Sequence, residues 1–329
     1  MNIRKLFAII LAALLIIASL SALAEEIPTP EGDDNHISIG ATAVPHEEII
    51  EGVVRAKLEA AGWEVEVVPF TDYVLPNTSL EDGEIDANYF QTWRYLVEQN
   101  ETRGLHLVEV LGIHLEPMGL YGAAYSSIDE IPEGASIAVP NDGSNESRAL
   151  KLLHDNGIIT LGETDDLYDL SNISENPKGI EFVELAAEQI THSLEDVNAA
   201  VINGNYALEA GLNPAEDALV IESADSDESY KYINYLVVKA GNEETAKTKA
   251  LIAAFANQDV VDFINATYRK RFSLVPFHHS HGPGNPVDPG HRRQGHRYPR
   301  RHRATDHLRH TFCGAGHRIR LPRGGSRSD

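Results

Sequence analysis

The sequence predicts an α/β protein of two lobes with a ligand cleft between them. Strand, helix and strand patterns follow one another within residues 36–70, and such a βαβ unit implies a parallel sheet with a right-handed crossover. The motif Glu116-Pro117-Met118-Gly119 interrupts this pattern, and a second α/β series follows it. Two lobes joined by two chain crossings, expected near residues 116–121 and 228–234, form a cleft that can close by hinge bending.

Each element of the first lobe is predicted from its hydrophobic pattern. The apolar run His36–Ala41 is typical of a short strand, and His46–Ala61 repeats apolar residues at helical spacing before a terminating glycine. Residues Glu64–Phe70 alternate polar and apolar side chains, as a half-buried strand does. We further expect a helix at Ser79–Asp86 and a strand at Leu105–Leu115.

The second lobe is predicted as a further alternation of strands and helices, with a return to the first lobe. The strands are expected at Ser136–Val139, Ile180–Leu185, Ala199–Ile202, Ala218–Glu222 and Ile233–Val238. The helices are expected at Asn145–Asn156, Ala187–Leu194, Tyr206–Ala210, Glu243–Asn257 and Val260–Lys270. The domain boundaries that follow are residues 36–120 plus 235–277 for lobe 1 and residues 121–234 for lobe 2.

The first 35 residues are predicted to be an export signal and a linker. Arg4 and Lys5 precede the apolar run Leu6–Leu20, and Ala22-Leu23-Ala24 is typical of a cleavage site. Residues 1–24 are therefore interpreted as a signal peptide, and an uncleaved membrane anchor is the alternative. The polar, proline-containing residues 25–35 are interpreted as a linker.

Charge divides the chain into an acidic body and a basic tail. The formal net charge is −23, yet residues 278–329 hold eleven arginines and three aspartates, so the tail carries +8 and the rest −31. So acidic a body disfavours nucleic-acid binding through like-charge repulsion. The tail is rich in His, Arg, Pro and Gly and cannot build a core, so we expect disorder. It is interpreted as the product of a shifted reading frame, with a genuine basic tail and a metal-binding tail as alternatives.

Motifs of the common enzyme classes are missing from the sequence. It contains no Gly-x-Ser-x-Gly elbow, no His-Glu-x-x-His helix and no Gly-x-x-x-x-Gly-Lys loop. The single cysteine excludes a disulfide framework, and the six histidines before residue 278 lack metal-ligand spacing. We therefore predict no catalytic residues, no cofactor and no metal site.

Two stretches point to a binding site for a small charged molecule. In Ser136–Leu153 an apolar strand leads through a polar turn into a helix, and unpaired N–H groups at a helix N-terminus can bind an anion. Arg148 in the first turns of that helix could add a two-pronged donor for a carboxylate. In Ile85–Leu96 aromatic residues gather, and they could form either core or a wall for an apolar ligand group.

Four segments in this order make the chain similar to the NlpA family of substrate-binding lipoproteins. They are LPNTSLEDGEIDANYFQTWRYL (75–96), EPMGLYG (116–122), GASIAVPNDGSNESRALKLL (134–153) and VINGNYALEAGL (201–212). The best-known members of that family are methionine-binding proteins of ABC importers. The resemblance implies a two-lobed periplasmic-binding-protein fold (type II-like) that holds an amino acid, typically methionine, and delivers it to a permease with its ATPase.

The resemblance also implies which residues bind the ligand. Arg148 would take the carboxylate with Asn145 beside it, and Asn205 and Asn234 would hold the amino and carboxylate groups. The side-chain pocket would be formed by Tyr73, Phe90, Thr92 and Tyr95. Thr92 stands where family members commonly have histidine.

The resemblance further implies an exported protein at the outer face of the cell membrane. Ala24-Glu25 offers no cysteine for the lipid anchor that the family carries. Two other functions stay open on the same scaffold, a lyase or dehydratase and a ligand-binding sensor or surface protein.

Overall fold

The computed structural model describes residues 26–122, 124–164, 166–223 and 229–268. The chain divides into two units, residues 1–287 and 288–329, and all described residues belong to the first. The predicted signal peptide and the predicted basic tail lie outside the described residues. No helix among the residues described is long and apolar enough to span a membrane.

The first lobe is built on a five-stranded mixed sheet in the order β2-β1-β3-β12-β4. Strand β1 pairs in parallel with β2 and β3, whereas β12 runs antiparallel to both β3 and β4. The strands are β1 (His36–Thr42), β2 (Glu64–Phe70), β3 (Ala87–Thr92), β4 (Leu107–Leu115) and β12 (Ile233–Lys239). The predicted βαβ unit at residues 36–70 is therefore present, and β12 inserts between two earlier strands.

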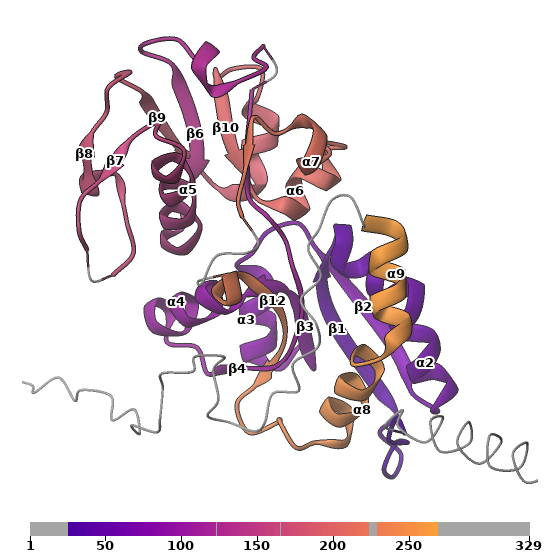
Figure 1. Cartoon of the computed structure of the whole chain (residues 1–329). Coiled ribbons are helices and arrows are strands. Elements are labelled where there is room, and N and C mark those ends of the chain that lie inside the picture. Colours follow the sequence, from indigo (N-terminus) through magenta and orange to yellow (C-terminus); the bar gives the residue numbers. More distant parts are fainter. Residues whose placement is uncertain (1–25, 123, 165, 224–228, 269–329) are drawn as a thin grey trace, which may run out of the picture. The chain divides into compact units, whose positions relative to one another are not determined.

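Helices cover both faces of this sheet (Figure 1). In β12, Leu236 and Val238 pack into one core, whereas Val237 and Tyr235 pack into the other, as the alternation of strand side chains requires. The first core is closed by η2 (Ala43–Glu47), η3 (Ile50–Val54), α2 (Arg55–Ala60), α8 (Ala246–Phe255) and α9 (Gln258–Tyr268). The second is closed by α3 (Leu75–Asp82) and α4 (Trp93–Arg103).

Helix α3 begins and ends four residues before the predicted helix Ser79–Asp86. Pro76 fits the first turn because its missing N–H has no helical partner there, and Gly83 ends the helix in a left-handed conformation with φ of 76°. The prediction missed both signals.

The second lobe is built on a five-stranded sheet in the order β11-β5-β10-β6-β9. Strands β6, β9 and β10 are parallel, and β5 is antiparallel to its neighbours β10 and β11. The strands are β5 (Gly119–Tyr121), β6 (Ser136–Pro140), β9 (Glu181–Leu185), β10 (Ala199–Ile202) and β11 (Val220–Ile221). A separate hairpin pairs β7 (Thr160–Leu161) with β8 (Ile173–Glu175).

The faces of the second sheet are covered by α5 (Gly143–Asp155) on one side and α6 (Gly204–Glu209) on the other. In β6, Ile137 and Val139 join the core under α5, while Ala138 joins the core that holds Tyr206 of α6. The remaining short helical segments are η4 (Ile128–Glu130), η5 (Leu170–Asn172), η6 (Ala187–Ser193), α7 (Pro214–Asp217) and η7 (Ser229–Tyr232). Strands β6 and β10 end at Pro140 and Ile202, and each is followed directly by an asparagine, Asn141 and Asn203.

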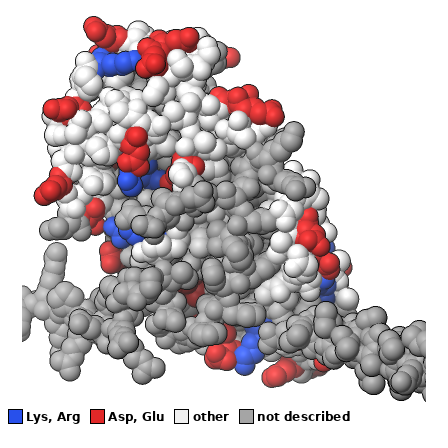
Figure 2. All heavy atoms as spheres, viewed as in Figure 1, with Lys and Arg blue, Asp and Glu red and all other residues white. Residues whose placement is uncertain are grey.

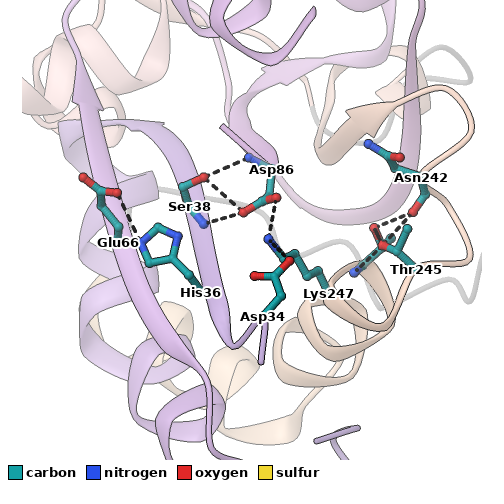
Figure 3. Close-up of polar contacts among 9 residues, drawn as sticks. Asp34, His36, Ser38, Glu66, Asp86, Asn242, Thr245 and Lys247 are labelled. Carbon is teal, nitrogen blue, oxygen red and sulfur yellow. Dashed lines mark hydrogen bonds and ion pairs between the residues drawn. The ribbon is translucent and has the colours of Figure 1, made fainter. Parts of the chain in front are cut away.

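Residues before β1 contact the first lobe. The Trp63 indole donates to the carbonyl of Pro28 at 2.7 Å, and Lys247 of α8 pairs with Asp34 at 3.2 Å. Figure 3 shows Asp86 between Ser38 and Lys247, where its carboxylate joins the start of β1 to α8. Acidic side chains are spread over the face drawn in Figure 2 rather than gathered in one patch.

Candidate ligand-binding site

A cavity is lined by residues of both lobes. All eight ligand-binding residues predicted from the sequence line it. Four further residues complete the lining: Gln91, Glu116, Asn203 and Gly204. The positions come from the ends of β3 and β10, the first turns of α5 and α6, and the segments that carry the chain between the lobes.

The aromatic residues form one wall of this cavity. The Tyr73 ring stacks on the Tyr206 ring at 4.9 Å between centroids and lies 5.8 Å from Phe90 and 5.6 Å from Tyr95. The Tyr95 hydroxyl donates to the carbonyl of Tyr73 at 3.1 Å. Burial raises the pKa of both phenols well above the ordinary value, so the wall is uncharged.

Thr92 lies at the end of β3 and caps helix α4. Its hydroxyl oxygen accepts from the backbone N–H of Tyr95 at 3.3 Å, the role that threonine takes at a helix N-cap. Thr92 therefore has a structural role as the N-cap of α4 in addition to lining the cavity.

Arg148 is buried, with 5% of its surface exposed, and a carboxylate of the chain itself pairs with it. Its Nε lies 3.0 Å from Glu222 Oε1, its Nη2 lies 2.5 Å from Glu222 Oε2, and Nη2 also donates to the carbonyl of Glu116 at 2.6 Å. The guanidinium also lies over the Tyr232 ring at 4.3 Å. Among the described residues, none accepts a hydrogen bond from Nη1, so two guanidinium protons remain for a ligand.

The N-terminus of α5 is predicted to bind an anion. In the structure its backbone N–H groups bind carboxylates of the protein itself. Asp142 is the N-cap and accepts from the Asn145 backbone N–H at 2.9 Å. Glu98 of α4 accepts from the Ser144 backbone N–H at 3.1 Å, and this contact joins the two lobes. The helix terminus therefore binds anions as expected, but the anions are Asp142 and Glu98.

Three asparagines of the second lobe form a fixed set of amides. Asn145 donates from Nδ2 to both Asp142 oxygens at 2.9 and 3.0 Å, and its Oδ1 accepts from Asn203 Nδ2 at 2.8 Å. The Tyr73 hydroxyl donates to Asn205 Oδ1 at 2.5 Å across the lobes. Two buried amide atoms, Asn203 Oδ1 and Asn205 Nδ2, have no hydrogen-bond partner among the residues that the structure describes. Such groups are costly in a folded protein unless a ligand or water satisfies them.

Two buried histidines and Glu116 adjoin the cavity, and the sequence did not predict this cluster. Glu116 Oε1 lies 2.7 Å from His114 Nε2 and 3.2 Å from His46 Nε2. His46 Nε2 also lies 3.2 Å from Asn234 Oδ1 and so orients that amide. Because these histidines are 68 positions apart along the chain, no local spacing could have signalled the cluster.

The outer nitrogens of both histidines are held by hydroxyl groups. Thr42 Oγ1 lies 2.8 Å from His46 Nδ1, and the Tyr89 hydroxyl lies 2.5 Å from His114 Nδ1. Burial lowers the pKa of His46 to about 4, so its imidazole is neutral. Burial alone would raise the pKa of Glu116, but His46, His114 and Arg148 bring it below its ordinary value. The ligand-type atoms of this cluster lie within 4.8 Å of one another, close enough to surround one cation. The ring nitrogens of both histidines already have protein partners.

Comparison with known proteins decides the family. Residues 37–275 match the family model described as NlpA lipoprotein. The chain belongs to the NlpA lipoprotein family. The membership and the two-lobed α/β fold predicted from the sequence motifs are thereby confirmed.

Several members of the family are similar along most of their length. A "D-methionine-binding lipoprotein MetQ" of Salmonella typhi is 38% identical over 72% of this chain and 88% of that protein. The structure of a nutrient-binding protein from Burkholderia cenocepacia bound to methionine is 39% identical, with a TM-score of 0.68 over 72% of this chain and 99% of that one. An "ABC transporter, periplasmic substrate-binding protein" from Coxiella burnetii is 36% identical, with a TM-score of 0.68 over 73% and 100%.

Proposed function

We propose that this protein is the exported substrate-binding component of an ABC importer and that it binds an amino acid, methionine or a close relative, without turnover. The observation that carries the proposal is the cavity lined from both lobes, which combines an uncharged aromatic wall with unpaired amide and guanidinium groups. Aromatic edges suit a thioether side chain, and the polar groups suit the charged end of an amino acid. The similar proteins from Salmonella typhi and Burkholderia cenocepacia, named as D-methionine-binding and bound to methionine, support the same class of ligand.

The ligand's carboxylate is assigned to Arg148 Nη1 and the Asn205 amide, and its side chain to Tyr73, Phe90 and Tyr95. In this arrangement Asn145 acts by orienting Asn203, because both of its polar side-chain atoms already bind protein groups. Asn234 is held by His46 and presents its other amide atom to the cavity.

Hinge closure encloses the ligand between residues 36–120 plus 235–277 and residues 121–234. Interlobe hydrogen bonds that would accompany closure are present, from Tyr73 to Asn205 and from Tyr206 to the carbonyl of Thr71 at 3.1 Å. The closed, loaded protein would then meet a permease with its ATPase at the outer face of the membrane.

Glu98→Gln is expected to weaken ligand binding roughly threefold to tenfold, because a charge-assisted hydrogen bond between the lobes becomes a neutral one. Asp166→Asn is the matched control. Arg94 and Asp166 are 3.3 Å apart, but Asp166 is 86% exposed, so this pair contributes little. Calorimetric titration of both variants checks the difference, and equal affinities in the two variants would exclude Glu98 as a closing contact.

The proposed function is tested by thermal unfolding of the protein with each amino acid in turn. Methionine at one hundred times its dissociation constant should add about 2.7 kcal/mol of stability and raise Tm by roughly 5–10 °C. A continuous assay for loss of methionine should detect no conversion. A larger shift with another amino acid would replace methionine as the ligand, and turnover would favour the lyase alternative.

A further inference from the structure

Two buried histidines and a carboxylate converge on one point beside the cavity. The Nε2 atoms of His46 and His114 lie 3.2 and 2.7 Å from the same oxygen, Glu116 Oε1. Both histidines are fully buried, and Glu116 is 5% exposed. Two imidazole nitrogens and one carboxylate oxygen are a donor set that binds zinc in proteins. The prediction of no metal site used local spacing alone and therefore could not take this cluster into account.

The arrangement of the two imidazole rings is close to that of two ligands on one zinc ion. With Zn–N and Zn–O distances of about 2.0–2.2 Å, tetrahedral ligand atoms stand about 3.3–3.5 Å apart and two imidazole centroids about 5.2 Å apart. The centroids of His46 and His114 are 5.3 Å apart, with 55° between the ring planes. The donor atoms of the cluster lie within 4.8 Å of one another. Small side-chain adjustments would therefore place all three donors around an ion.

The groups that hold the outer ring nitrogens permit metal binding at Nε2. Thr42 Oγ1 lies 2.8 Å from His46 Nδ1. The Tyr89 hydroxyl lies 2.5 Å from His114 Nδ1. A hydroxyl can donate or accept, so it can accept from an Nδ1 that carries the ring proton. Nε2 then carries a lone pair that can bind a metal ion, and the hydroxyl orients the ring as outer partners of metal-bound histidines do.

The cluster is open toward the cavity. Glu116 and Asn234 both line the cavity, and Asn234 Oδ1 lies 3.2 Å from His46 Nε2. Gly204 has no side chain on this side, where a Cβ would stand 3.4 Å from Glu116 Oε2. An ion held by the three residues could therefore enter from the cavity and keep a fourth position for the Asn234 oxygen or for water.

The nearby arginine does not exclude a cation from this cluster. Arg148 is the one cation among the described residues that line the cavity, and Glu222 pairs with it at 2.5 Å. Glu116 is the one carboxylate in the same lining. A metal ion bound to Glu116 would therefore face an arginine whose charge is already offset.

We propose that His46 Nε2, His114 Nε2 and Glu116 Oε1 form a binding site for one divalent transition-metal ion of the zinc type. Imidazole ligands favour zinc and similar ions over magnesium and calcium, which prefer oxygen ligands alone. The inference does not depend on the proposed function, because no part of the amino acid enters the argument.

The test measures thermal unfolding of the full protein, first stripped of metal with a chelator, with and without zinc. Zinc at one hundred times its dissociation constant should raise Tm by roughly 5–10 °C, whereas magnesium should change Tm by less than about 1 °C. His46→Gln and His114→Gln should each remove most of the zinc shift. His106→Gln is the matched control and should keep it, because the His106 side chain is 73% exposed and lies outside the cluster.

Thermal unfolding also separates this site from the nine histidines of residues 278–329. Zinc that binds the folded and the unfolded chain equally well does not raise Tm. A zinc shift that persists in both cluster variants, or an equal shift with magnesium, would overturn the assignment of the two imidazoles as ligands.

Anomalous diffraction at the zinc absorption edge keeps the test decisive if the cluster variants fold poorly, because it needs only the wild type. Crystals grown with zinc should show an anomalous peak between His46, His114 and Glu116. Zinc peaks at other places only, or a wild type whose Tm does not respond to zinc, would overturn the proposal. Methionine binding, measured separately on the metal-free protein, would remain unaffected by that result.

Discussion

Arg148→Ala is expected to abolish amino-acid binding and to lower the free energy of unfolding by about 3 kcal/mol. Removing one partner of a buried ion pair leaves the other charge uncompensated, at a cost of about 3–5 kcal/mol. Glu222 keeps 18% of its side chain exposed, which places the expected loss at the lower end. The substitution also removes the donor to the Glu116 carbonyl and the cation over the Tyr232 ring. Chemical denaturation and calorimetric titration measure the two effects.

The double variant Arg148→Ala with Glu222→Ala separates the two consequences. Because no charge is left without a partner, it should be more stable than Arg148→Ala alone while still failing to bind ligand. A single variant that loses less than about 1 kcal/mol would contradict the buried pair. A single variant that retains wild-type affinity would remove Arg148 from the ligand site.

Acidification from pH 7 to pH 4 is expected to cost the wild type about 3 kcal/mol through His46. Complete burial lowers the pKa of this imidazole from 6.5 to about 4 in the folded chain. Between these pH values the unfolded chain binds a proton that the folded chain does not, so stability is lost as pH falls. The size of the loss follows from about 1.4 kcal/mol for each pKa unit.

His46→Gln is the comparison that isolates this contribution, because glutamine can still donate to Glu116 and accept from Thr42. The stability difference, wild type minus variant, should decrease by about 3 kcal/mol between pH 7 and pH 4. Burial raises the pKa of Asp142 to about 6, so that group favours the folded state on acidification, but it does so in both proteins and cancels. Parallel pH profiles of the two proteins would mean that His46 titrates normally.

The sequence patterns predicted most of the fold because its strands and helices carry strong local signals. The βαβ unit at residues 36–70 and the strands ending at Pro140 and Ile202 follow from apolar runs bounded by polar turns. The motifs also placed all eight predicted binding residues at one cavity. The predicted position of helix α3 is wrong by four residues, because the prediction did not use Pro76 as a start signal and Gly83 as a stop signal.

The groups that complete the site could not be predicted because they meet only in the folded chain. Glu222 lies 74 positions from Arg148, and Glu98 lies 46 positions from Ser144. His46 and His114 resemble scattered surface histidines in the sequence, yet both are fully buried. Knowledge of sheet order would have helped, because β12 carries Asn234 to a register opposite His114 and Thr92.

A crystal structure of the protein grown with methionine tests the central claim most directly. We expect one amino acid in the cavity, with its carboxylate at Arg148 and Asn205 and its side chain against Tyr73, Phe90 and Tyr95. Methionine bound elsewhere on the protein, or a cavity that stays closed to it under saturating conditions, would contradict the account.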